Sequence, residues 1–214
     1  MNILGDCYYY GNGVKKNSIK AVGFYIKSAQ KNNPNALNSL GDCYFYGRGV
    51  SQNYIKAVEL YKKSAKLGNL NAVSNLGNHY LLGKGVKQNF SKAIDCFEQT
   101  SKYGNSLNGL GLCYLDGKGV EQNYPKAIEY FTNAAEIGNS DAFYNLGKCY
   151  LYGKGKRKKT SKAIEFYQKA SELNNSDAMY DLGNIYLIGK EVEQDYSKAF
   201  EYLEKAAENG SINA

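Results

Sequence analysis

The sequence lacks most of the patterns that enzymes, metal sites and membrane spans require. Its 214 residues include one histidine, and neither a nucleophile elbow nor an H-E-x-x-H motif is present. A single histidine without partners cannot build a catalytic triad or a metal site. The cysteines show no paired C-x-x-C spacing for zinc, and no run of about 18 apolar residues could span a membrane. We therefore expect no catalytic residue, no metal, no cofactor and no transmembrane segment.

Proline is scarce and charge of one sign does not dominate. Two prolines and 23 glycines fit many short helices separated by glycine turns. A formal net charge of +7 with 22% charged residues makes the protein moderately basic. That balance permits weak attraction to nucleic acid, anionic lipid or acidic proteins without requiring any of them. No secretory signal follows Met1, so we take the cytoplasm as the default compartment.

What the chain does contain is one motif that recurs six times. Its clearest copy is LGDCYFYGRGV, at residues 40–50. The leucines that open the copies are Leu4, Leu40, Leu76, Leu110, Leu146 and Leu182. Neighbouring copies are 36 residues apart, except for one interval of 34. A period of this length is typical of a solenoid, a stack of similar supersecondary units. We expect one array over residues 1–214, with repeats starting near 1, 36, 72, 106, 142 and 178.

Each repeat is predicted to form two helices and no strand. The first helix of the second repeat shows apolar and small residues on one face, at Ala36, Leu40, Cys43, Tyr44 and Gly47. The second helix does the same at Ala57, Leu60, Tyr61, Ser64 and Ala65. No stretch shows a sustained period of two. The sequence therefore predicts an all-α protein, an α/α solenoid of about six helix-turn-helix repeats.

Helix boundaries are marked by polar and left-handed residues. A capping Asn or Asp is expected just before five of the second helices, at Asn17, Asn53, Asn89, Asn123 and Asp195. In the fifth repeat this position is Lys159, and Thr160 or Ser161 could provide the cap. The second helices are expected to stop at Asn32, Gly68, Gly104, Gly138, Asn174 and Gly210, because Gly and Asn most readily adopt the left-handed conformation that closes a helix.

One irregularity in spacing lies between Gly104 and Leu110, where two residues are missing relative to the other repeats. We expect the first helix of the fourth repeat to start about half a turn late. The seam between the third and fourth repeats would then be loosened, and we predict a kink there.

The recurring pattern resembles the Sel-1-like repeat, a relative of the tetratricopeptide repeat. The second repeat shows it in full, at Ala36, Leu40, Gly41, Tyr44, Gly47, Gly49, Val50, Asn53, Lys56 and Ala57. The resemblance covers essentially the whole chain, with departures at Lys156, Glu191 and the two-residue deletion. It implies an α/α solenoid coiled into a right-handed superhelix, used as an adaptor or scaffold, in which the first helix of each repeat lines the concave face.

Three features have a structural and a functional interpretation. The G-x-G elements do not follow a strand, as a dinucleotide fingerprint requires, so we expect turns. Cys7, Cys43, Cys113 and Cys149 share one repeat position, where Cα atoms about 8–10 Å apart are too distant for disulfides. We expect buried free thiols, with bridges as the alternative. His79 occupies the same position in its repeat, and we expect it to be partly buried against the next repeat.

The strongest charge cluster lies in the loop of the fifth repeat. It comprises Lys154, Lys156, Arg157, Lys158, Lys159 and Lys162. One interpretation is a solvated loop, and the other is an anionic contact or a nuclear-import-like patch. Any contact with nucleic acid or an anionic membrane surface would have to use this basic loop.

The 21 tyrosines fall into two sets. One set recurs in every repeat and should pack, at Tyr8, Tyr44, Tyr80, Tyr114, Tyr150 and Tyr186. The second is aromatic, lies on the first helix and varies between repeats, at Tyr9, Tyr10, Phe45, Tyr46, Tyr144, Tyr152 and Tyr180. Varied aromatics on a groove are suited to binding, because tyrosine supplies contact area and a hydrogen bond together.

These observations favour a non-enzymatic scaffold that binds a protein or peptide on its concave face. The predicted contacts are variable first-helix residues: Asn38, Asp42, Tyr46, Ser74, Asn78, Tyr144, Lys148, Tyr152, Tyr180 and Asn184. One alternative is a hydrolase of the cell-wall or β-lactam type, to which a few similar proteins are linked. Another is a structural spacer within a larger protein. Both ends of the chain fall inside repeats, so we expect a fragment of a longer array whose missing start could hold a targeting signal.

Overall fold

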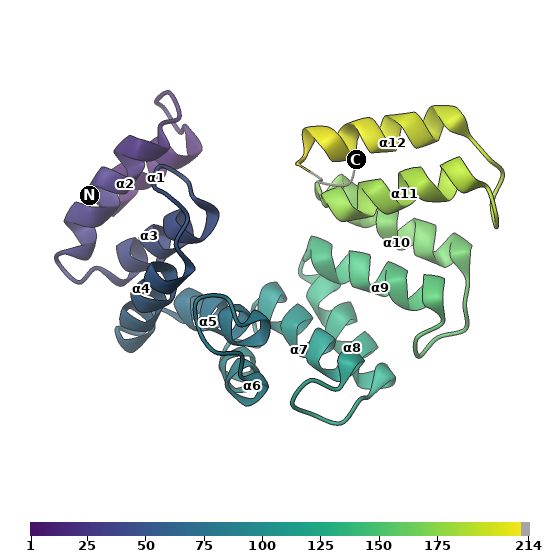
Figure 1. Cartoon of the computed structure of the whole chain (residues 1–214), viewed down its shortest axis with the longest axis horizontal. Coiled ribbons are helices and arrows are strands. Elements are labelled where there is room, and N and C mark those ends of the chain that lie inside the picture. Colours follow the sequence, from purple (N-terminus) through teal and green to yellow (C-terminus); the bar gives the residue numbers. More distant parts are fainter. Residues whose placement is uncertain (211–214) are drawn as a thin grey trace. The chain divides into compact units, whose positions relative to one another are not determined.

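The structure, a computed structural model, describes residues 1–210, which form twelve α-helices and no strand (Figure 1). The chain divides into an N-terminal unit that ends at Ser101 and a C-terminal unit that begins at Lys102. The N-terminal unit holds α1 to α6, at Asn2–Tyr10, Ser18–Ala29, Pro34–Tyr46, Tyr54–Lys66, Leu70–Leu82 and Phe90–Gln99. The C-terminal unit holds α7 to α12, at Gly104–Asp116, Tyr124–Glu136, Ser140–Tyr152, Thr160–Glu172, Ser176–Ile188 and Tyr196–Glu208.

Within each unit, every helix packs against the next one in the chain. The odd-numbered helices are the first helices of the repeats, and the even-numbered helices are the second. The chain is therefore an all-α solenoid of helical hairpins, as the period predicts. Across residues 1–210, no helix is long and apolar enough to cross a membrane.

The helix caps follow the sequence closely. All five predicted capping residues of the second helices accept a hydrogen bond from a backbone N–H of the first turn, at Asn17, Asn53, Asn89, Asn123 and Asp195. Lys159 precedes α10 without a side-chain cap. The prediction that Thr160 or Ser161 replaces it is wrong, because Thr160 is the first residue of the helix and its hydroxyl donates to Glu191 of the next repeat. Five of the six predicted helix ends have positive φ, at Asn32, Gly68, Gly138, Asn174 and Gly210.

Gly104 is the exception, because it begins a helix instead of ending one. The prediction that the first helix of the fourth repeat starts half a turn late is therefore wrong. Gly104 is the first residue of α7, which has the same 13-residue length as α5. The missing residues are absorbed earlier, because α6 has 10 residues instead of the 13 in α4. α6 ends at Gln99, directly before Thr100, whose buried hydroxyl donates to the carbonyl of Cys96 at 2.7 Å.

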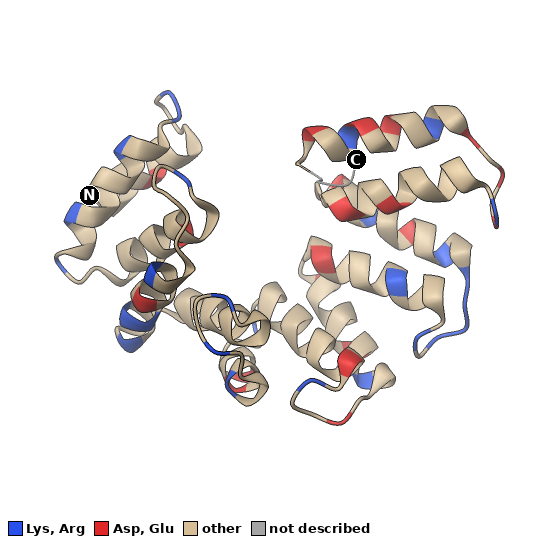
Figure 2. Ribbon diagram, in the orientation of Figure 1, with Lys and Arg blue, Asp and Glu red and all other residues tan. Residues whose placement is uncertain are grey.

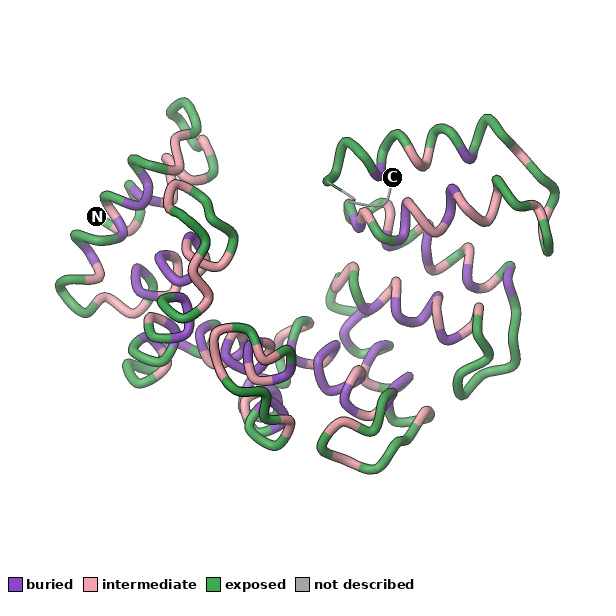
Figure 3. The backbone as a smooth tube through the Cα atoms, in the orientation of Figure 1, coloured by how far each residue is buried: buried purple, intermediate pink, exposed green. Residues whose placement is uncertain are grey.

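In each hairpin, a glycine of the first helix packs directly against a large side chain of the second helix. A Cβ at Gly41 would lie 2.6 Å from the ring of Tyr61, closer than real Cβ contacts allow. The same relation holds in every repeat, for the pairs Gly5–Tyr25, Gly41–Tyr61, Gly77–Phe97, Gly111–Phe131, Gly147–Tyr167 and Gly183–Leu203. The five aromatic members are at most 2% exposed. The glycine after the repeat leucine is thus required so that the two helices can approach each other across this ring. Buried residues lie along the helices, whereas the loops between them are mostly exposed (Figure 3).

The repeat tyrosines pack as predicted, but they are half-buried rather than buried. Tyr114, for example, stacks on Tyr130 with ring centroids 5.6 Å apart, and the Lys126 ammonium lies 4.3 Å from its ring centroid. The fully buried aromatics belong to the second helices instead. In five repeats the largest buried side chain therefore comes from the second helix, at the position of Tyr61, which the sequence placed on the apolar face of that helix.

The G-x-G elements are turns, as predicted. Gly47 ends α3 with a φ of 68°, a left-handed conformation that glycine adopts without strain. A Cβ at Gly49 would lie 2.4 Å from the carbonyl oxygen of Ser18 in the preceding repeat. The second glycine thus lets the loop approach the start of the neighbouring second helix.

All five cysteines are free thiols. Cys43, Cys113 and Cys149 are buried, as predicted, whereas Cys7 and Cys96 are half-buried. Burial raises the pKa of the Cys43 thiol to about 12, so it is not a reactive thiolate at neutral pH.

His79 differs from its prediction in two respects. It is only 3% exposed, and its ring packs against Phe45 and Tyr61 of the preceding repeat, at centroid distances of 5.2 and 5.4 Å. Its Nδ1 lies 2.6 Å from the carbonyl oxygen of Lys84 and therefore donates to it. Burial lowers the pKa of the imidazole, which fits an uncharged packing residue.

Candidate functional site

The predicted contact residues form stripes along the first helices. In α3, Asn38, Asp42 and Tyr46 are spaced four residues apart and so lie on one face. The side chains at the two ends of this stripe differ in character: Tyr46 is 56% exposed, whereas Asn38 is half-buried. The stripe therefore joins a buried polar end to an exposed aromatic end.

Asp42 is the centre of a hydrogen-bond network in the N-terminal unit. Its carboxylate accepts from the Tyr61 hydroxyl at 2.7 Å and from the amides of Asn38 and Asn75, each at 3.2 Å. Burial raises the pKa of Asp42 to about 6, against the opposing effects of the Tyr61 hydrogen bond and the Arg48 charge. An amide of Asn75 also donates to Asn38 at 3.1 Å, so these groups connect neighbouring repeats.

Much of the polar part of the stripe therefore holds the stack together. In the C-terminal unit, Asn145 donates to Asn108 of the preceding repeat at 2.9 Å, as Asn75 does to Asn38. Sequence reasoning missed Asn75 and Asn145, which stand immediately before the repeat leucine. Their repeated occurrence at that position was the available signal. Amides so engaged have less capacity to bind a ligand backbone than the sequence suggests.

The exposed end of the α3 stripe is aromatic and cationic. The Arg48 guanidinium lies 5.7 Å from the Tyr9 ring centroid and 4.8 Å from that of Tyr46, and it donates to the Tyr9 hydroxyl at 2.7 Å. Tyr10 meets Tyr9 edge-on at 4.9 Å and is 67% exposed. Arg48 occupies the variable position of the G-x-G turn and was not predicted as a contact residue.

The stripe in the C-terminal unit has a similar composition. The Lys148 ammonium lies 5.2 Å from the Tyr144 ring centroid. Burial raises the pKa of the Asp181 carboxyl in the next repeat, and the neighbouring Tyr144 hydroxyl and Lys148 charge oppose that rise. Tyr152 extends the stripe and is 62% exposed. The geometry thus brings Tyr144 and Lys148 together with an acidic side chain that the sequence did not single out.

The remaining predicted contacts offer less surface. Ser74 is buried, at 6% exposure. Asn78, Tyr180 and Asn184 are half-buried. Of the ten predicted residues, Tyr46 and Tyr152 are the exposed ones.

Tyr46 and Tyr152 belong to a wider set at the last residue of each first helix. Large apolar side chains occupy this position in five of the six repeats, and all five are more than half exposed. We call this set the terminal row: Tyr10, Tyr46, Leu82, Tyr152 and Ile188. Asp116 takes the position in the fourth repeat. Sequence reasoning named Tyr10, Tyr46 and Tyr152 but not Leu82 and Ile188, which stand at the same position, two residues after the repeat tyrosine.

The predicted basic loop connects α9 to α10 and is exposed from Lys154 to Lys159 (Figure 2). Two of its six cations are paired: Lys158 with Glu191 at 2.6 Å and Lys162 with Glu165 at 3.0 Å. An open cavity of about 600 Å³ lies at this loop, lined by Tyr150, Lys156, Arg157, Lys158 and Lys159.

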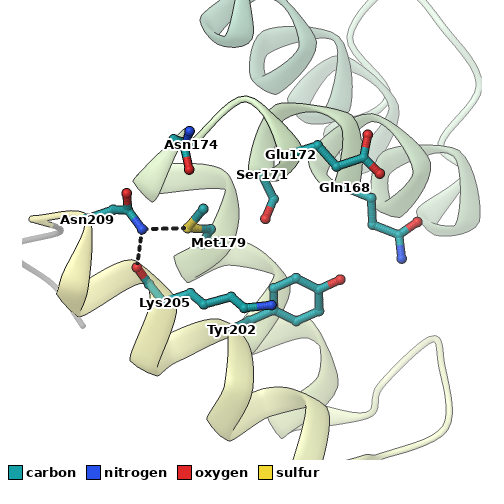
Figure 4. A pocket seen from close by; sticks show the side chains of 8 residues that line it. All are labelled: Gln168, Ser171, Glu172, Asn174, Met179, Tyr202, Lys205 and Asn209. Carbon is teal, nitrogen blue, oxygen red and sulfur yellow. Dashed lines mark hydrogen bonds between the residues drawn. The ribbon is translucent and has the colours of Figure 1, made fainter. Parts of the chain in front are cut away.

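A second cavity, of about 550 Å³, lies between the second helices α10 and α12 (Figure 4). Met179 stands there at the position that Phe143 fills in the preceding repeat, where the Phe143 and Phe166 rings are 6.5 Å apart. Two of its polar side chains are engaged: Lys205 pairs with Glu201 at 2.6 Å, and Asn209 donates to the carbonyl of Lys205 at 2.8 Å. We assign no ligand to this cavity. In the described part of the chain, no group of three His, Cys, Asp or Glu side chains is arranged to hold a metal ion.

Comparisons with known proteins agree with this architecture. The Sel1 repeat family matches residues 1–33, 34–69, 71–105, 104–139, 140–175 and 176–211. A comparison with curated proteins finds no match.

Solved structures show the same fold. A Sel1 repeat protein from Oxalobacter formigenes is 29% identical, with a TM-score of 0.81, and the match covers 96% of this chain and 83% of that one. A protective antigen from uropathogenic Escherichia coli strains, described as having an SLR fold, is 28% identical with a TM-score of 0.63; this chain spans 45% of its length, and the match covers 98% of this chain. An immunity protein from Pseudomonas aeruginosa, at 24% identity and a TM-score of 0.59, shares the fold over 80% of this chain and 66% of its own.

Sel1 repeat proteins generally act as protein-interaction scaffolds, and the fold is typically non-catalytic. The Sel1 repeat model matches each of the six helical hairpins in turn, and the chain therefore belongs to the Sel1 repeat family.

Proposed function

We propose that this chain is a non-enzymatic scaffold that binds a protein or peptide along its first helices, through the contact stripes and the terminal row. The observation that carries the proposal is the exposure of the terminal row, at 67% for Tyr10, 56% for Tyr46, 57% for Leu82, 62% for Tyr152 and 66% for Ile188. Single exposed apolar side chains are common on any surface. Three members of the row lie in the N-terminal unit and two in the C-terminal unit, so within each unit the same exposed position offers large apolar side chains to a partner.

The neighbours of the terminal row suit a peptide ligand. Tyr46 lies beside the Arg48 guanidinium, whose carbon is 4.8 Å from the Tyr46 ring centroid, and Arg48 is exposed. A partner could therefore bury apolar side chains against the rings while its polar groups meet charged side chains at the same place. Tyrosine and arginine are the residue types that most often dominate binding energy in protein interfaces.

The test is selection of peptides from a displayed library on the wild-type protein, followed by titration calorimetry of the enriched peptides. We expect a variant with Tyr46→Ser and Tyr152→Ser to bind them at least about thirtyfold more weakly, because loss of even one central aromatic contact costs about 2 kcal/mol or more. The matched control is Tyr196→Ser with Phe200→Ser, which removes two aromatics of similar exposure, 66% and 67%, from a second helix.

If the control pair weakens binding as much as the terminal-row pair, the first helices are not the binding surface. Unchanged binding in the terminal-row variant, with its fold intact by circular dichroism, would also refute the proposal.

A further inference from the structure

The loop between α9 and α10 has lost residues that brace the equivalent loops. In four other repeats a glutamine side chain donates to a backbone carbonyl near the end of the first helix at 2.7–2.9 Å, from Gln52, Gln88, Gln122 and Gln194. Lys158 takes that position in the fifth repeat. The position of the half-buried Val50, Val86, Val120 and Val192 is taken by the exposed Lys156. Two residues that stabilise the loop elsewhere are thus replaced by cations.

These replacements surround the open cavity of about 600 Å³. Lys158 is partly neutralised by Glu191. Lys156, Arg157 and Lys159, which also line the cavity, form no ion pair with any residue in 1–210. Three cationic residues therefore line the cavity without an ion-pair partner among residues 1–210, so the potential around the cavity is positive.

The floor of the cavity is also unusual. In the other five repeats a lysine of the second helix lies 4.3–5.6 Å from the ring centroid of the repeat tyrosine. The corresponding Lys162 instead pairs with Glu165 and lies 5.9 Å from the ring centroid of Phe166. The ring of Tyr150 thus lines the cavity, while the ring of Phe166 stacks on it at 5.5 Å.

We propose that this cavity binds an acidic peptide segment of a partner protein, at a site that shares no residue with the contact stripes or the terminal row. The cations would pair with the partner's carboxylates, and Tyr150 would contact their aliphatic stems. A cavity of this size suits a few side chains. Single-stranded nucleic acid is recognised by rows of aromatic rings on which successive bases stack, whereas here one ring lines the cavity. A peptide also fits the general role of the family in protein interactions.

The experiment measures fluorescence anisotropy of a labelled hexaglutamate peptide titrated with the full chain at low salt. Hexaglutamine, a single-stranded oligothymidine and vesicles with 30% anionic lipid are measured in parallel. We expect hexaglutamate to bind and hexaglutamine not to bind. Affinity should fall with added salt, because salt screens exposed charges. Exposed ion pairs are individually weak, so Lys156→Glu with Arg157→Glu should weaken binding by about tenfold.

The matched control is Lys15→Glu with Lys16→Glu, which changes the net charge by the same amount at two exposed lysines of the first repeat's loop. Equal losses in the two double variants would show that binding follows net charge alone and would overturn the site. Absence of hexaglutamate binding at low salt would overturn it as well. The wild-type protein could instead bind oligothymidine or the vesicles more tightly than hexaglutamate. If the Lys156→Glu, Arg157→Glu variant then lost that binding, the cavity would be reassigned to the tighter ligand.

Discussion

Replacement of Gly41 by alanine tests the packing on which every repeat depends. The new Cβ would lie 2.6 Å from Cε1 and 2.9 Å from Cδ1 of Tyr61, and this ring is 2% exposed. The ring cannot move freely, because its hydroxyl donates to Asp42 at 2.7 Å. Overpacking of this kind costs about 3 kcal/mol at the upper end of its usual range. Alanine recovers about 1 kcal/mol through its better helix propensity. We therefore expect a net loss of about 2 kcal/mol.

Gly23 provides a control of opposite sign. It lies within α2, and a Cβ there would meet no atom within 4 Å. Gly23→Ala should therefore stabilise the protein by about 0.5–1 kcal/mol. Urea unfolding followed by circular dichroism at 222 nm measures both variants, with the midpoint and slope compared separately. If Gly41→Ala is as stable as Gly23→Ala, the close approach of the helices does not explain the glycine of the repeat.

Two further predictions use the same unfolding assay. Phe131→Ala should lower the free energy of unfolding by about 3–5 kcal/mol, because the ring is fully buried. Tyr114→Ala should lower it clearly less, because that ring is half-buried. The reverse order would contradict the assignment of the core to the second helices. Asp42 has a folded-state pKa of about 6, above the value of 3.8 for an unperturbed carboxyl, so the folded protein retains a proton that the unfolded chain releases. Its contribution to stability should therefore fall as pH rises from about 4 to about 6 and stay constant above that. The urea midpoint of Asp42→Asn minus that of the wild type should therefore increase from about pH 4 to about pH 6. If the midpoints of the two proteins change with pH in the same way, the raised pKa of Asp42 is wrong.

The sequence determined the features that depend on local chemistry. The capping side chain of Asn53 and the left-handed conformation of Gly47 are properties of a few neighbouring residues, so their type and spacing predicted the helix ends. The period of the repeat leucines predicted the solenoid, because hairpins of one kind must bury their apolar faces against each other. At the site, the same logic identified Tyr46 and Tyr152 as exposed variable positions.

Tertiary structure alone decided the features that depend on contacts between helices. The sequence places both the Tyr114 position and the Phe131 position on packing faces, but only the structure shows that Phe131 is the fully buried ring, because burial depends on which side chain meets the glycine across the hairpin. The deletion was visible in the sequence, but only the helix bounds of the structure show that α6 is shortened while α7 is complete. Side-chain contacts between repeats also depend on the distance between helices, which residue spacing does not encode. The hydrogen bond from Arg48 to the Tyr9 hydroxyl of the preceding repeat is one such contact.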